Sequence, residues 1–136
     1  YWPKSIDSVL ENDMLEFIEN NLWFITLSPR IGDFDVLSGT NINQSNAKKL
    51  ADAATKCWEA IKDKNLQEFG KSFSDSFNAQ VAMFPNMVNQ DILAIIENYK
   101  NDALGWKLSG AGGGGYLVLV SDKAVKNAIQ IRIVRP

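Results

Sequence analysis

The chain has 136 residues, of which 46% are hydrophobic and 22% charged, a balance typical of a folded globular domain. The absence of histidine excludes sites that pair serine or cysteine with histidine, and the single cysteine, Cys57, excludes a disulfide within the chain. A net charge of −2 gives no basic surface for nucleic acid or an anionic membrane. We therefore expect one domain over residues 1–136, with neither nucleic acid nor membrane as partner, and we assign no metal-binding residue.

The first part of the chain predicts helix, then strand, then loop. Hydrophobic residues recur at helical spacing over residues 5–20, which indicates one or two short helices with Ser5 and Asp13 as candidate N-caps. Residues 22–27 are a short run of apolar, β-branched and aromatic side chains, typical of a buried strand. Residues 30–43 lose this periodicity and are rich in Gly, Asp, Ser and Asn, so we expect a loop there.

Two amphipathic helices are predicted next. An apolar stripe over residues 47–61 indicates a helix of about five turns, with Asn43 or Ser45 as its N-cap. A second stripe, spaced by three and four over residues 66–81, follows Asn65, which is the expected cap. The phenylalanines of this second stripe lie at the spacing of core residues, so we interpret them as core packing rather than as a ligand groove.

A third helix and two strands come next in the predicted order. Pro85 ends the second helix, and a third helix begins after its cap Asn89 and runs to Tyr99. Strands are expected over 104–109 and 116–120.

The C-terminal part predicts one more helix and one more strand. Asp122 is the expected cap of a short helix reaching Asn127, and residues 129–134 alternate as in a strand with one buried face. The order β, helices, β, β, α, β predicts an α+β fold. It fits a ferredoxin-like split βαβ plait, an antiparallel sheet with helices on one face and extra helices in the first crossover.

The most unusual segment is residues 110–115, in which five of six residues are glycine. A hairpin needs only one or two glycines for its positive φ angles, and further glycines cost stability. We therefore interpret the tract as a close backbone approach, either of amides to a phosphate or of the loop to another loop that binds one. The alternative is a flexible hairpin loop.

Two known phosphate-binding loops are excluded by the residues around the tract. It does not end in Gly-Lys-Ser/Thr, as a Walker P-loop does, and it leads into a strand rather than a helix. The same context excludes a dinucleotide fingerprint. A phosphate bound here would lack a helix N-terminus and cationic or metal-ligating groups, which residues outside this chain would supply.

Residues 107–115 read Lys-Leu-Ser-Gly-Ala-Gly-Gly-Gly-Gly and precede an apolar strand. This string resembles the third conserved motif of the GHMP kinases. Its residues are most similar to those of the same motif in the sugar-kinase branch that includes fucokinase and heptose 7-phosphate kinase. Residues 22–27, with Arg30 soon after, resemble the strand that opens the C-terminal domain of this family. The specific part of the resemblance covers about ten residues.

The resemblance implies the C-terminal domain of an ATP-dependent sugar kinase, with a ferredoxin-like fold. The family's N-terminal domain carries a Gly-x-Gly-Ser-Ser nucleotide loop and an acidic catalytic residue, and neither occurs in this chain. We therefore assign no catalytic residue and expect the chain alone to be inactive. ATP and Mg²⁺ act in the intact enzyme, and none is expected on this chain alone. The implied partners are the N-terminal kinase domain and a sugar or sugar-phosphate substrate, and the implied compartment is the cytoplasm.

The resemblance assigns nucleotide and substrate binding to the backbone of the tract. The residues concerned are Ser109, Gly110, Ala111, Gly112 and Gly113. Two cations are possible additions: Lys107 is either a phosphate clamp or directed to solvent, and Arg30 lies at a strand end that would face the cleft.

Other polar and aromatic candidates have simpler interpretations. Asp33 and Asp35, two residues apart in a loop, could bind a metal or a sugar hydroxyl, but such pairs are typical of turns. Cys57 has no basic neighbour in sequence and is interpreted as an inert thiol. The tryptophans Trp23, Trp58 and Trp106 lie in apolar patterns and are expected in the core, whereas Trp2 is too near the terminus to assign.

The alternative function is a free-standing ferredoxin-like module that binds a small phosphorylated ligand or a partner protein. The two hypotheses differ in surface chemistry. The C-terminal domain of a kinase exposes an apolar face where the N-terminal domain packs, and we expect that face within residues 1–20. A free-standing module has no large apolar patch.

Overall fold

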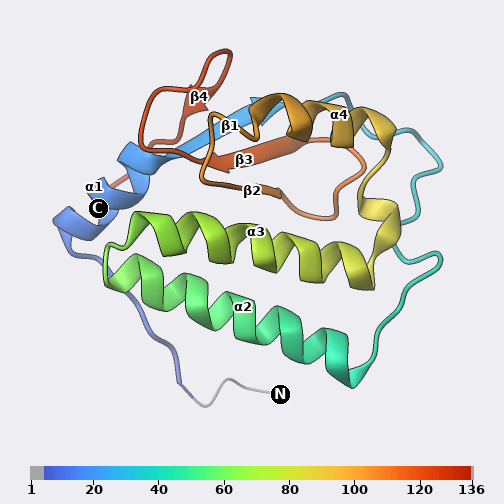
Figure 1. Cartoon of the computed structure of the whole chain (residues 1–136), viewed down its shortest axis with the longest axis horizontal. Helices are drawn as coiled ribbons and strands as arrows, with labels where there is room; N and C mark the ends of the chain where they lie inside the picture. Colours follow the sequence, from blue (N-terminus) through green and yellow to red (C-terminus); the bar gives the residue numbers. More distant parts are fainter. Residues whose placement is uncertain (1–4, 136) are drawn as a thin grey trace.

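A computed structural model describes residues 5–135 of the chain (Figure 1). Within that range no helix is long and apolar enough to cross a membrane. The elements in chain order are α1 (Asn12–Asn21), β1 (Leu22–Thr26), α2 (Gln44–Lys62), α3 (Leu66–Met83), the 3-10 turn η1 (Pro85–Met87), α4 (Gln90–Tyr99), β2 (Gly105–Leu108), β3 (Tyr116–Val120) and β4 (Ile129–Gln130).

The four strands form one sheet in the order β2-β3-β1-β4, with every neighbouring pair antiparallel. It follows that β1 and β2 run in the same direction with β3 between them, and α2, α3 and α4 lie in the connection that joins them. Strands β3 and β4 likewise run in the same direction on either side of β1. These are two split crossover units, so the predicted ferredoxin-like α+β plait is confirmed, including the extra helices in the first crossover.

Asparagine side chains begin three of the helices. The side chains of Asn43, Asn65 and Asn89 each accept a hydrogen bond from the backbone N–H three residues later, at 2.9 to 3.1 Å. These bonds satisfy amides that the first turn of a helix leaves unpaired. The three predicted caps are confirmed, and Ser45, the alternative to Asn43, lies inside α2.

The prediction for the first segment is only partly correct. One helix forms, and it begins at Asn12, so residues 5–10 have no regular structure and Ser5 is not an N-cap. The N-cap is Glu11, which makes no side-chain capping bond, and Asp13 lies in the first turn rather than at the cap. Trp2 lies outside the described residues.

The predicted helix from Asp122 to Asn127 is wrong. The segment forms turns instead, because the buried Ser121 hydroxyl donates to backbone carbonyls and its oxygen accepts from the Lys123 amide at 3.2 Å. Asn127 has a φ of 63°, which lies outside the helical region. Local side-chain bonding therefore replaces the second crossover helix.

The last strand is much shorter than predicted. Its register pairs with β1 cover Ile129 and Gln130, and one more backbone bond joins the Ile131 amide to the Leu22 carbonyl at 3.0 Å. Ile129 is 57% exposed, so the expected buried face does not form there.

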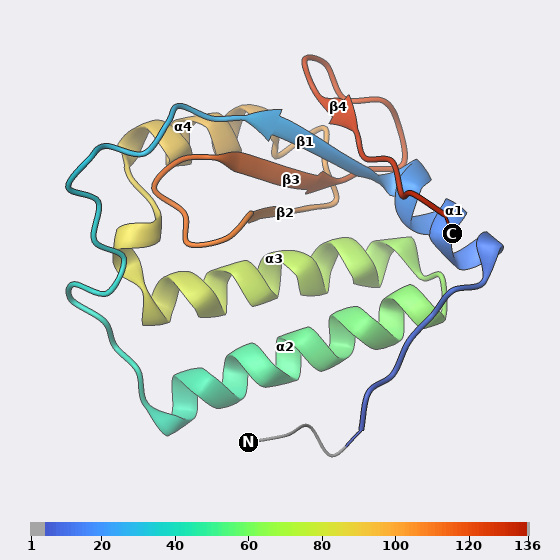
Figure 2. The same cartoon turned by 180° about the vertical axis from the view of Figure 1, so that it is seen from behind.

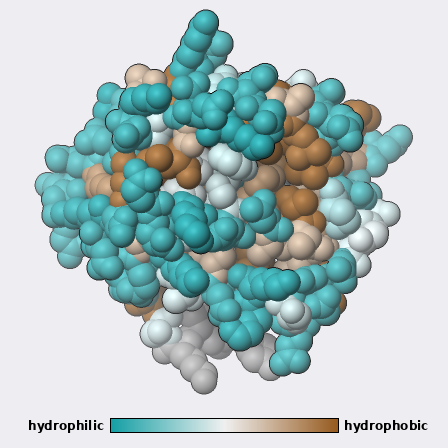
Figure 3. All heavy atoms as spheres, in the orientation of Figure 1, coloured by the Kyte–Doolittle hydropathy of each residue, from teal (hydrophilic) through white to brown (hydrophobic). Residues whose placement is uncertain are grey.

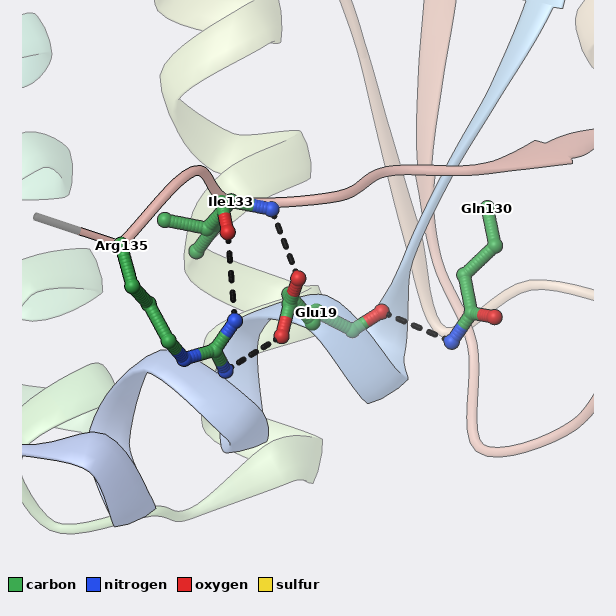
Figure 4. A network of polar contacts seen from close by, with 4 residues as sticks. All are labelled: Glu19, Gln130, Ile133 and Arg135. Atoms are coloured by element: carbon green, nitrogen blue, oxygen red, sulfur yellow. Dashed lines mark hydrogen bonds and ion pairs between the residues drawn. The ribbon is translucent and has the colours of Figure 1, made fainter.

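Beyond β4 the chain follows α1 instead of the sheet (Figure 4). The buried Glu19 carboxylate accepts from the Ile133 amide at 2.7 Å and pairs with Arg135 at 2.5 Å, while its backbone carbonyl accepts from Gln130. The Arg135 guanidinium and the Ile133 amide hold the pKa of Glu19 below its usual value. This network ties the C-terminal segment to the first helix.

Helix α4 covers one face of the sheet, here called the covered face (Figure 1). On this face Ile25, Leu117 and Leu119 pack with Ile92 and Ile96 of α4. Phe77 of α3 joins the same cluster, and Phe69 is buried in a second one, so the phenylalanine stripe belongs to the core as predicted.

The three interior tryptophans are less buried than predicted. Trp23 and Trp106 are half-buried and pack against the core cluster. Trp58 is half-buried as well, and its indole N–H donates to the exposed Asp7 carboxylate at 2.8 Å. The indole N–H needs a hydrogen-bond acceptor, and an exposed acceptor keeps part of the tryptophan at the surface.

Helix α3 runs along the outer edge of β2 (Figure 2). A Cβ on Gly105 would overlap the backbone of Gly70, and one on Gly70 would overlap Leu104. The Ser74 hydroxyl accepts from the Trp106 amide at 2.9 Å. The helix therefore approaches the strand at backbone distance and occupies the hydrogen-bonding edge that β2 would otherwise expose.

The opposite face of the sheet, here called the open face, has no helix in front of the middle of β1 and β3 (Figure 2). At one end of this face Val120 is buried in a cluster with Phe69 of α3 and Phe17 of α1. The strand register places Phe24, Lys107, Val118 and Ile129 on this face, and Tyr116 lies there too, edge-on to Phe24 at 5.3 Å between ring centroids. In contrast, the side of the molecule that carries α4 is mainly hydrophilic, with small separate hydrophobic areas (Figure 3).

Candidate functional site

The glycine tract, here called the glycine loop (residues 109–115), is held by hydrogen bonds to segments far away in sequence. The Gly113 amide donates to the Met87 carbonyl at 2.8 Å, and the Gly115 amide donates to Ser28 at 3.3 Å. The Arg30 Nε donates to the Gly112 carbonyl at 2.8 Å. The loop therefore has a defined position between β2 and β3, against the end of β1 and the η1 turn.

Close packing accounts for three of the glycines. A Cβ on Gly112 would overlap Met87, one on Gly113 would overlap the Phe34 ring, and one on Gly114 would overlap Ser28. Gly112 and Gly113 also have φ angles of 77° and 70°, which glycine adopts without strain. These contacts agree with the predicted close approach of the loop to another loop and disagree with a flexible hairpin.

The exposed end of the loop keeps unused hydrogen-bond donors. Within residues 5–135, the amides of Gly110 and Ala111 donate to no backbone carbonyl or side chain. Gly110 is exposed and has a φ of 73°, the neighbouring Ser109 is exposed as well, and Gly112 is buried. Two successive free amides in such a turn suit the oxygens of an anion.

Arg30 lies at the same end of the loop. Its guanidinium sits 5.8 Å from the centre of the Phe34 ring, and a Cβ on Gly110 would lie 3.7 Å from its terminal nitrogen. Among the described residues no carboxylate pairs with Arg30 within 4.0 Å. The structure thus brings together the sequence candidates Arg30, Gly110 and Gly112, and leaves the cation unneutralised.

Lys107 points toward α3 rather than into solvent. Its Nζ donates to the Ser76 hydroxyl at 3.1 Å and to Gln80 Oε1 at 2.7 Å. The side chain is half-buried, and this burial lowers the pKa of Lys107. It lines a cavity of about 500 Å³, here called the Lys107 pocket, together with Gly110 and Ala111.

The remaining loop residues face two other hollows. Ser109 borders a hollow of about 190 Å³ on the open face, beside Phe24 and Tyr116. Gly113 borders a hollow of about 310 Å³ that also contains Asp33. The predicted site residues are therefore neighbours along the loop, but they do not converge on one cavity.

The two loop aspartates do not form a metal site. Asp35 accepts from the Leu37 amide at 2.9 Å, and its backbone carbonyl accepts from Asn86, as does that of Ser38. Within residues 5–135, no three carboxylate, cysteine or histidine side chains gather at one point. These contacts agree with the turn interpretation of Asp33 and Asp35.

Several residues around the site were not predicted from sequence. Ser76 and Gln80 hold Lys107, Met87 holds Gly113, and Phe34 stacks on Arg30. The four-residue spacing of Ser76 and Gln80 predicts that both lie on one face of α3. The sequence does not indicate that β2 packs against that face.

The Cys57 thiol is half-buried, and this burial raises its pKa. A thiol held protonated in this way is a poor nucleophile, which agrees with the interpretation of Cys57 as inert.

Comparisons with known proteins identify the family of the chain. Residues 57–133, more than half of the chain, match the family described as GHMP kinases C terminal. A segment of 74 residues is 38% identical to the L-fucokinase/L-fucose-1-P guanylyltransferase of Bacteroides fragilis. That segment is 54% of this chain and 8% of the relative, so the chain corresponds to a small part of that protein. The chain therefore belongs to the GHMP kinases, as a C-terminal domain of that family.

Proposed function

We propose that the chain acts within an ATP-dependent sugar kinase and forms one wall of its nucleotide and sugar cleft through the glycine loop. The observation that carries this proposal is the pair of free amides at Gly110 and Ala111 beside the unneutralised Arg30. The relative whose name contains L-fucokinase supports a sugar as the acceptor.

The chemistry available to this wall is electrostatic. Phosphoryl transfer is accelerated mainly by positioning the phosphate and by stabilising charge on its oxygens. The free amides and Arg30 would donate to phosphate oxygens of ATP, and the hydrogen bonds to Met87 and Ser28 would keep the loop in place. Ser109, on the open-face side of the loop, would donate its hydroxyl to the sugar or to the transferred phosphate.

The loop has no group that could serve as a catalytic base. Ser109 to Gly115 contain no carboxylate, and the chain has no histidine. We therefore place the base, and the carboxylates that hold Mg²⁺, in a separate N-terminal kinase domain. Mg²⁺ would neutralise charge on the ATP oxygens. The chain alone is then inactive, and the complete enzyme acts in the cytoplasm.

The open face gives that N-terminal domain an apolar surface to pack on. Tyr116 of β3 is 48% exposed and Ile129 of the edge strand β4 is 57% exposed. The segment 1–20, where the apolar surface was expected, also exposes hydrophobic side chains, namely Ile6 and Leu10. Apolar side chains gathered on one side of a sheet are typical of a surface that another domain covers.

The test is ATP-dependent phosphorylation of a panel of sugars, including L-fucose, by the full-length protein and two glycine variants. Gly112→Ala forces the loop away from Met87, whereas Gly32→Ala adds a methyl group in open space and serves as the matched control. We expect at least about a tenfold loss of kcat/KM for Gly112→Ala and no change for Gly32→Ala. Equal activity of the two variants, or no transfer to any sugar, would contradict the proposal.

A free-standing binding module is the second candidate, because the same free amides and Arg30 suit any small phosphorylated ligand. The two functions separate in one experiment. The module binds a sugar phosphate with an affinity that depends on Arg30, and it transfers no phosphate from ATP to a sugar.

A further inference from the structure

The Lys107 pocket has a composition that the proposed sugar cleft does not explain. It lies between β2, the N-terminal half of α2, the end of α3 and the loop before α2, with a volume of about 500 Å³. Most of its wall is hydrophobic. The hydrophobic lining residues are Val36, Leu37, Leu50, Phe84, Met87 and Leu108.

The polar end of the pocket consists mainly of hydrogen-bond donors. Lys107 Nζ uses neutral oxygens of Ser76 and Gln80, and within residues 5–135 no carboxylate lies within 4.0 Å of it. Gly110 and Ala111 belong to the same wall, and their amides are free. A half-buried cation without a counter-charge attracts an anion, and a bond between charged partners is stronger than one between neutral groups.

Two kinds of ligand fit this arrangement poorly. A free sugar needs polar partners for most of its hydroxyls, whereas Gln80 is the pocket's one amide side chain and its Oε1 is already taken by Lys107. A neutral hydrocarbon would match the walls but leave the Lys107 charge in a site depleted of water.

We propose that the Lys107 pocket binds a small amphipathic anion, with its phosphate or carboxylate on Lys107 Nζ at the end of the pocket bordered by Gly110 and Ala111, and its apolar body against the hydrophobic walls. Leu37, in the loop before α2, lines the pocket and is 66% exposed. Burial of this side chain on binding adds favourable free energy in proportion to the apolar area covered.

The pocket is connected to the glycine loop by a direct contact. Met87 lines the pocket, and its carbonyl accepts from the Gly113 amide at 2.8 Å. A ligand against Met87 and Gly110 therefore stabilises the loop in its present position. The proposal does not require kinase activity, since its primary readout is binding.

The experiment measures binding of 1-naphthyl phosphate, 1-naphthoate, 1-naphthol and inorganic phosphate to the full-length protein by calorimetry. Each anion that carries the ring is expected to bind at least about tenfold more tightly than naphthol or phosphate alone. Lys107→Met removes the charge and keeps the length of the side chain, so it should abolish that tenfold preference. Lys126→Met, an exposed lysine that does not line the pocket, is the matched control.

A second variant tests the apolar wall. Leu37→Ser changes an exposed side chain, so the fold is retained, and we expect affinity for both ring-bearing anions to fall several-fold. Hydrogen exchange adds an independent readout, because saturating 1-naphthyl phosphate should slow exchange of the Gly113 amide.

Three results would overturn the proposal. Equal affinity for naphthol and naphthyl phosphate would show an apolar hollow without an anion site. Unchanged binding in Lys107→Met would place the anion elsewhere. Absence of binding by every probe to the full-length protein would mean that another part of that protein fills the pocket. Each of these results leaves the kinase assay, and with it the proposed function, unaffected.

Discussion

Neighbouring residues of strand β3 point to opposite faces of the sheet and are buried to different extents. On the covered face Leu117 and Leu119 have no exposed surface, since they pack under Ile92 and Ile96 of α4. Between them, Val118 points to the open face and is half-buried. Strand β3 is therefore hydrophobic on both sides, although on the open face helical residues bury only its end at Val120.

The two faces of the sheet differ in how far helices of this chain cover them. A strand that is apolar on both faces is normally covered on both. Here the covered face is complete within the chain, and the open face carries the aromatic pair of Phe24 and Tyr116, with Lys107 and Ser109 at its border. The covered face contributes most of the core, and the exposed part of the open face is the surface that we propose for ligands and for a second domain.

The largest expected effect is on the covered face. Leu119→Ala leaves a cavity among fully buried side chains and should lower the free energy of unfolding by about 3 kcal/mol. Val118→Ala, one residue away on the open face, should lower it by about 1 kcal/mol or less. Denaturant unfolding of the two variants measures the contrast, and equal losses would mean that both faces contribute equally to the core.

The next effect distinguishes stability from function on the open face. Tyr116→Ala removes one ring of the edge-on pair with Phe24 and should cost the chain about 1 kcal/mol. In the full-length protein the same change should lower sugar-kinase activity several-fold, because the N-terminal domain loses an apolar contact. Unfolding measurements on the chain and activity assays on the full-length protein are compared. A normal activity would remove the open face from the proposed domain contact.

A third prediction concerns the helix that creates the covered face. Asn89→Ala removes the side-chain acceptor for the Ile92 amide and should destabilise α4 by about 1 kcal/mol. Asn98→Ala, at an exposed position near the other end of α4, makes no such bond and is the control. Thermal unfolding should show a lower midpoint for Asn89→Ala, and equal midpoints would mean that tertiary packing alone sets the start of α4.

The smallest effect concerns the C-terminal segment at the end of the sheet. The pKa of Glu19 lies below its ordinary value of 4.5, so the unfolded chain binds this proton more readily than the folded chain. The stabilisation is therefore present above pH 4.5 and is lost as the pH falls through the folded-state value. Glu19→Gln should flatten this part of the acid response.

The measurement for Glu19 is urea unfolding at pH 6 and at progressively lower pH. The wild-type chain should lose more stability over that interval than Glu19→Gln. Glu16→Gln, an exposed position on the same helix, is the control and should behave as the wild type. If all three chains respond alike, the network in Figure 4 makes no contribution that depends on pH.

Local sequence determined much of the fold. Three asparagines fixed the starts of α2, α3 and α4, because a side-chain cap acts on amides only three residues away. The apolar runs that became β1 and β3 were short and combined β-branched with aromatic residues. The split crossover topology followed from the order of these elements.

The errors occurred where local and distant interactions compete. Asp122 to Asn127 had a helical pattern, but the Ser121 hydroxyl bonds and the positive φ of Asn127 favour turns. The alternation over residues 129–134 suggested a full strand, yet the Ile133 amide bonds to the Glu19 carboxylate 114 residues away. A pattern within residues 129–134 cannot indicate a hydrogen-bond partner that lies so far away in the sequence.

The candidate site shows the same division. The sequence by itself determined the composition of the glycine loop, and with it the positive φ angles and the backbone close approach that only glycine permits. The tertiary structure alone decided which groups meet there: Arg30 on the Gly112 carbonyl, Met87 on the Gly113 amide, and Lys107 on α3. The physical reason is range, because backbone preferences act within a few residues whereas these contacts form only once the sheet and its helices have packed.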